Sequence, residues 1–114
     1  MPPKKNPLKL NKLQLRTLAL AQAIAADPDM AHVNEASGEA TLLKLPHAHG
    51  NHVHVGKFVV SARDASGFDN AAVWAVLTRK GLVRRDDPLT MTLTVAGLSY
   101  DTGLGDKFMA PSDH

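Results

Sequence analysis

Apolar positions recur at helical spacing near the start of the chain. One stripe contains Leu13, Thr17, Leu20, Ala21 and Ile24, and a second stripe, on nearly the opposite side, contains Leu15, Leu18, Gln22 and Ala25. The pattern predicts a helix over residues 11–26, with Asn11 as its cap and Asp27-Pro28-Asp29 as its end. A surface helix ordinarily has one apolar face. Two faces therefore predict a helix buried on both sides, within the domain or between subunits, and we expect a homodimer with helix 11–26 in its interface.

A β-hairpin is predicted in the middle of the chain. Residues 29–40 are polar and rich in small side chains, so we expect a loop there, followed by a strand from Thr41 to Ala48. Gly50-Asn51 is a favourable two-residue turn because both positions tolerate a positive φ. Val53, Val55 and Phe58 then indicate the return strand.

The second half of the chain alternates between helix and strand signals. Residues 59–65 fit a short helix or the end of the strand, and Ser66-Gly67 interrupts the pattern. Asp69 can cap a helix over residues 70–80, and Gly81 stands where a helix commonly ends. A short strand at Leu82-Val83 and a turn over residues 84–88 are expected next. Residues 89–95 alternate strictly between apolar side chains and threonine, which predicts a strand.

This second half resembles the winged helix-turn-helix superfamily. The superfamily commonly ends its recognition helix with a phrase like L-x-x-K-G-L-V, and a later phrase L-T-x-x-G follows its β-hairpin wing. The first phrase is matched by Leu77, Lys80, Gly81, Leu82 and Val83, and the second by Leu93, Thr94 and Gly97. The resemblance covers about residues 59–100. It implies a helix pair over 59–65 and 70–80 and a C-terminal wing hairpin with its tip at 84–88. Together with the long N-terminal helix and the His-rich β-hairpin, this predicts an α+β, winged helix-turn-helix-like fold.

The resemblance implies a small DNA-binding protein, a transcriptional regulator of double-stranded DNA. Directional contacts are expected from Asn70, Thr78 and Arg79 on the recognition helix. Phosphate contacts are expected from Lys80, Arg84 and Arg85 near the helix end and the wing. The alternative is that these basic side chains form a solvated face partly neutralised by Asp86 and Asp87.

The predicted recognition helix also carries Ala71, Trp74 and Ala75, which read bases poorly. Winged helices also serve as protein-interaction modules, so the fold does not settle the function. The alternative is therefore a metal-binding or protein-interaction module on the same scaffold without DNA binding. Exposure of Trp74 and the alanines as an apolar patch would favour a protein partner.

Positive charge is concentrated at the start of the chain. The formal net charge is +2, yet residues 1–16 contain five basic residues and no acidic one: Lys4, Lys5, Lys9, Lys12 and Arg16. We expect residues 1–10, with three prolines, to be a flexible basic arm from which Lys4 and Lys5 follow phosphates. The alternative is a solvated tail. Residues 11–102 then form the single domain, and 103–114 a frayed tail.

Four of the six histidines lie between positions 47 and 54, namely His47, His49, His52 and His54. A two-residue turn at Gly50-Asn51 places His49 opposite His52 and His47 opposite His54, with all four rings on one face. Such a face suits one divalent transition metal: zinc, nickel or copper. Three alternatives are an exposed polar hairpin, a proton-sensitive patch and phosphate contact by charged rings.

Other classes of function find little support. The chain of 114 residues has room for one domain and contains no cysteine, which excludes disulfides, thiolate metal sites and a cysteine nucleophile. No apolar run approaches ~20 residues and no secretory signal is evident, so we expect a cytoplasmic protein without a membrane span. Residues 47–52 resemble the H-x-H-x-D-H zinc motif of metallo-β-lactamase-fold hydrolases, but Asn51 replaces the aspartate and the chain is too short. With no other catalytic motif, we expect no enzyme.

Overall fold

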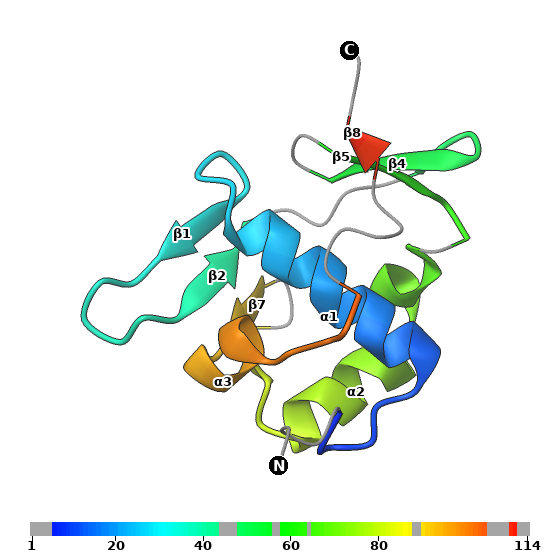
Figure 1. Cartoon of the computed structure of the whole chain (residues 1–114). Helices are drawn as coiled ribbons and strands as arrows, with labels where there is room; N and C mark the ends of the chain where they lie inside the picture. Colours follow the sequence, from blue (N-terminus) through cyan, green and yellow to red (C-terminus); the bar gives the residue numbers. More distant parts are fainter. Residues whose placement is uncertain are drawn as a thin grey trace.

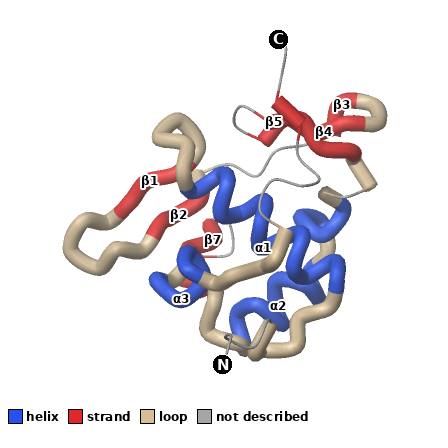
Figure 2. Tube along the Cα trace, viewed as in Figure 1, coloured by secondary structure: helices blue, strands red, loops and turns tan. Residues whose placement is uncertain are grey.

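The computed structural model is an α+β fold with two antiparallel sheets (Figures 1 and 2), as the sequence predicts at this level. It describes residues 6–43, 48–55, 58–63, 65–87, 90–104 and 110–111. The helical elements are α1 (Lys12–Ala25), the short 3₁₀ helix η1 (Ser66–Asp69), α2 (Ala71–Arg79) and α3 (Val95–Ser99). The strands are β1 (Ala31–Val33), β2 (Ala40–Leu42), β3 (Ala48–His49), β4 (His52–Val55), β5 (Phe58–Ser61), β6 (Val83–Asp87), β7 (Thr90–Leu93) and β8 (Ala110–Pro111).

The long helix α1 begins at a capping box, as local sequence predicts. The side chain of Asn11 accepts from the Gln14 N–H at 2.8 Å, and the Gln14 side chain accepts from the Asn11 N–H at 2.9 Å. The helix then crosses the middle of the molecule (Figure 1). It contacts both sheets, α2 and α3.

Both apolar stripes of α1 are covered within the same chain. Ile24 of the first stripe and Leu18 of the second are each fully buried. Gln22 lies on the second stripe, and its Nε2 donates to the carbonyls of Gly97 and Tyr100, both at 2.9 Å. The intramolecular explanation for the two stripes therefore holds, and the homodimer prediction loses most of its motivation.

The first sheet has the strand order β1-β2-β7-β6. Ala40, Leu42, Val83 and Leu93 of this sheet are buried in the core with α1. The segment predicted to be a loop contains strand β1. It is a strand because Ala31 pairs with Leu42 and Val33 with Ala40. The loop proper is the short connection from β1 to β2, where the side chain of Asn34 accepts from the Ala36 N–H at 2.9 Å.

The second sheet has the order β3-β4-β5-β8 and confirms the predicted hairpin turn. His49 pairs with His52 across Gly50-Asn51, and Gly50 has a φ of 69°. Residues 59–65 do not form the first helix of a pair, so that expectation is wrong. Val59 and Val60 instead pair with His54 and Val53 of β4, a setting that suits β-branched side chains.

The helix predicted over 70–80 is present as α2, with a different cap. Asn70, rather than Asp69, caps it by accepting from the Ala72 N–H at 3.0 Å. The helix ends in a Schellman motif: the Leu82 N–H donates to the Leu77 carbonyl, and Gly81 has a φ of 79°. The glycine in the K-G-L-V phrase therefore performs the conformational role that the sequence suggests.

Strand β7 ends at Leu93 and is followed at once by α3, which the alternating pattern did not reveal. The Thr94 hydroxyl caps α3 by accepting from the Gly97 N–H at 3.1 Å, and it donates to the Gly81 carbonyl at 2.7 Å. A Cβ on Gly97 would lie 2.0 Å from the Leu82 carbonyl oxygen. This close approach explains why the L-T-x-x-G phrase ends in glycine.

The described parts of the expected arm and tail contact the rest of the fold. Asn6 and Leu8 are held by Tyr100, whose hydroxyl donates to Asn6 Oδ1 at 2.6 Å and accepts from the Leu8 N–H at 3.2 Å. Leu10 is buried. Near the other end, Ala110 and Pro111 form β8, which pairs with β5. Of the helices in the described ranges, none has both the length and the apolar character of a membrane span.

Candidate functional site

Four exposed basic side chains mark the junction between α2 and β6. Arg79 is the last residue of α2, Lys80 is its C-cap, and Arg84 and Arg85 follow in β6. The Schellman turn at Gly81 connects the two elements, which contact each other. Arg79 and Lys80 therefore lie at the helix end of this α2–β6 corner and Arg84 and Arg85 in its strand, whereas Lys4 and Lys5 lie outside the described residues.

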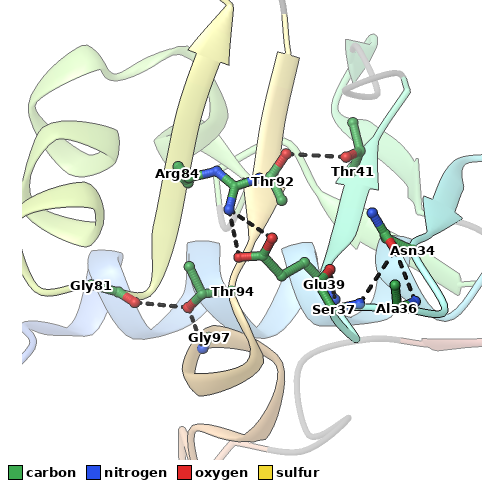
Figure 3. A network of polar contacts seen from close by, with 10 residues as sticks. All are labelled: Asn34, Ala36, Ser37, Glu39, Thr41, Gly81, Arg84, Thr92, Thr94 and Gly97. Atoms are coloured by element: carbon green, nitrogen blue, oxygen red, sulfur yellow. Dashed lines mark hydrogen bonds and ion pairs between the residues drawn. The ribbon is translucent and has the colours of Figure 1, made fainter.

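One of these basic side chains, Arg84, forms an ion pair with Glu39, a carboxylate that the sequence did not predict to lie near it. Arg84 Nη1 lies 2.6 Å from Glu39 Oε1 and 2.8 Å from Glu39 Oε2 (Figure 3). The Arg84 side chain is 51% exposed and the Glu39 side chain 17%. The two residues are 45 positions apart in the chain, so no local pattern could have connected them. The side chains of Asp86 and Asp87, which were considered as neutralising acids, lie outside the described residues.

The sheet register explains why Arg84 and Glu39 meet. Arg84 pairs with Thr92, Thr92 with Thr41, and Thr41 with His32, so these four residues form one row across the first sheet. The hydroxyls of Thr41 and Thr92 lie 3.1 Å apart (Figure 3). Glu39 is two residues before Thr41 and therefore on the same side of the sheet. This face is polar, whereas the other face packs against α1.

Two of the residues predicted to contact bases take part in the hydrogen bonding of α2 itself. Asn70 Oδ1 caps the helix, and the Thr78 hydroxyl donates to the Trp74 carbonyl at 2.8 Å. Both residues are exposed. Their side chains are therefore partly committed to the helix before any ligand is bound, and Arg79 is the strongest remaining candidate for a directional contact from α2.

Trp74 does not form a surface patch. It is 2% exposed, its Nε1–H donates to the Phe68 carbonyl at 2.9 Å, and its ring stacks on Phe68 with centroids 6.1 Å apart. The exposed side of α2 carries Ala71, Ala72 and Ala75 instead. The large apolar group that would have favoured a protein partner is thus part of the core, and only small side chains remain outside.

The histidine hairpin is partly described. His52 and His54 alternate in β4 with Val53 and Val55, which are buried. The two imidazole centroids lie 5.0 Å apart, with the rings nearly perpendicular at 83°. His49 pairs with His52 as predicted, but its side chain and the whole of His47 lie outside the described residues. Within the described part of the chain, no three potential ligands are grouped around a metal position.

No model of a protein family, no curated protein and no solved structure matches this chain.

Proposed function

We propose that this protein binds double-stranded DNA through α2 and the β6–β7 hairpin, as a winged-helix-like regulator. The observation that carries the proposal is the group of four exposed basic side chains at the junction of α2 and β6. The order of elements supports it: α1, β2, α2 and the β6–β7 hairpin follow one another, and β2 pairs with the second hairpin strand. A winged helix arranges its first helix, first strand, recognition helix and wing in this way.

The proposed fold departs from the usual winged helix at one place. The first helix of the pair is expected over residues 59–65, but this segment begins within β5, and only the 3₁₀ turn η1 lies between that strand and α2. The support therefore comes from α2 and the hairpin that follows it, and not from a complete helix-turn-helix. A DNA ligand agrees with the cytoplasmic location that the sequence predicts.

The chemistry of the surface favours contacts to phosphate over base readout. Positive charge comes from the side chains of Arg79, Lys80, Arg84 and Arg85. Contacts from such side chains to phosphate give affinity for DNA but do not distinguish one DNA sequence from another. The exposed alanines of α2 permit close approach and apolar contact with thymine methyl groups. We therefore infer binding that depends steeply on salt and discriminates modestly between sequences.

A titration of mixed-sequence duplex DNA at several salt concentrations tests the proposal. The logarithm of the binding constant should fall linearly with the logarithm of the salt concentration. Replacing Arg79 and Lys80 with alanine should weaken binding and flatten that slope. The matched control is Arg63→Ala, since Arg63 is also exposed but precedes η1, at the other end of α2. Absence of binding at low salt, or an equal effect of the control, would contradict the proposal.

The exposed alanines favour a second candidate, a protein-interaction module on the same scaffold. Ala75→Arg separates the two. It adds a positive charge to the exposed side of α2, so it should strengthen DNA binding, whereas a protein partner packed on the alanines should be lost.

A further inference from the structure

We propose that the β3–β4 hairpin binds one divalent transition metal ion, with His52 as the central ligand and His54 and His49 beside it. This site is independent of DNA binding, because it lies on the second sheet and not on the α2–β6 corner.

The first step is the position of His52 within the sheet. Strand β4 lies between β3 and β5, and His52 pairs with His49 on one side and with Ser61 on the other. Val53 and Val55 are buried, so the alternating His52 and His54 occupy the opposite face, away from the core. Both histidines are partly exposed, which leaves them accessible to an ion. Phe58 pairs with Val55 and therefore lies on the face of the sheet opposite the histidines.

The second step is the separation of the two described rings. An imidazole nitrogen binds zinc at about 2.0–2.1 Å, and two such ligands at a tetrahedral angle hold their ring centroids about 5 Å apart. The centroids of His52 and His54 lie 5.0 Å apart. The spacing along one strand therefore already suits two ligands of a single ion.

The third step is the third ligand. His49 is directly opposite His52, and the Cβ atoms of such cross-strand pairs lie about 4.5–5.5 Å apart. The Gly50-Asn51 turn fixes this register, with Gly50 at a φ of 69° that other residues adopt only with strain. The register therefore puts three histidine positions on a patch two strands wide. An all-imidazole set suits copper, nickel and zinc, and does not suit magnesium or calcium.

Isothermal titration of the full chain with zinc, nickel and copper salts at pH 7.5 tests the site, with magnesium as a comparison. We expect one transition-metal ion per chain and no heat with magnesium. His52→Ala should weaken binding by more than about tenfold, the loss typical even of outer-shell partners of a metal ligand. The matched control is His32→Ala, since His32 is an exposed histidine on β1 of the other sheet and should not matter. Circular dichroism of each variant shows whether the fold is kept.

A second variant tests the geometry without removing a ligand. One glycine inserted between Gly50 and Asn51 keeps every histidine but shifts His49 relative to His52, so the affinity should fall. Side-chain NMR signals of His52 and His54 should shift together on addition of zinc. No heat with any transition metal, equal affinity in the insertion variant, or loss of binding in His32→Ala would overturn the proposal.

Discussion

The Arg84 guanidinium and the Glu39 carboxylate form an ion pair in which a single nitrogen, Nη1, is within 2.8 Å of both carboxylate oxygens. The pair joins the residue just before β2 to the second residue of β6, two strands that are not neighbours, since β7 lies between them. In the proposed DNA complex, a phosphate group would compete with Glu39 for the same guanidinium. The carboxylate therefore weakens a contact that the sequence alone would assign at full strength.

Replacing Glu39 with glutamine should strengthen DNA binding. The change removes a negative charge and releases Arg84 from its carboxylate partner. Exposed ion pairs contribute up to about 1 kcal/mol, so the gain should reach about fivefold at low salt. Fluorescence anisotropy with a labelled duplex measures it. The control is Glu39→Gln in an Arg84→Ala background, where most of the gain should vanish. A gain of equal size there would show that Glu39 does not act through Arg84.

Replacing Arg84 and Arg85 together with alanine should weaken binding to every duplex sequence. Each phosphate contact contributes about one unit to the salt slope, so the slope should fall by about two units at most. The pairing of Arg84 with Glu39 places the expected change nearer one unit. Salt titrations on two unrelated duplexes measure both effects. An unchanged slope would remove the β6–β7 hairpin from the DNA interface.

Gly97→Ala should destabilise the protein. The added Cβ would lie 2.0 Å from the Leu82 carbonyl oxygen, so α3 must move away from the start of β6. Overpacking of this kind costs about 1–3 kcal/mol or more in the free energy of unfolding. Urea denaturation followed by circular dichroism measures the loss. Ala96→Ser, at the neighbouring exposed position of α3, should change stability by less than about 0.5 kcal/mol. Equal stability of the two variants would contradict the close packing at Gly97.

The homodimer prediction requires a test that avoids buried positions. Leu18 is fully buried within the chain, so Leu18→Glu should unfold the protein by placing an unpaired charge in the core, at a cost of about 3–5 kcal/mol. Leu15 is only half-buried, so Leu15→Glu should keep the fold, and it should separate the subunits of any homodimer formed through α1. Small-angle scattering of the unmodified protein and of Leu15→Glu measures the change. A monomer at high concentration of the unmodified protein would show that helix α1 has no role between subunits.

Local sequence determined the elements whose stabilising contacts lie within a few residues. The capping box of α1 spans Asn11 and Gln14, the Schellman motif of α2 spans Leu77 to Leu82, and the hairpin turn is Gly50-Asn51 itself. In each case one short segment holds both the donor and the acceptor. These were also the features that located the candidate sites on α2, on β6 and on the histidine hairpin.

Tertiary structure decided whatever depends on a distant partner. Residues 59–61 became strand because β4 was available for pairing, Ala31–Val33 became strand because β2 was, and the segment from Asn6 was held by Tyr100. Trp74 is buried because its ring stacks on Phe68 in the core. Arg84 contacts Glu39 because the register of the sheet brings them together, and no local pattern encodes that register. Hydrophobic periodicity reports that a face is buried but not what covers it, and charge in the sequence does not reveal its partner. Long-range contacts decide what covers a buried face and which group a charged side chain pairs with.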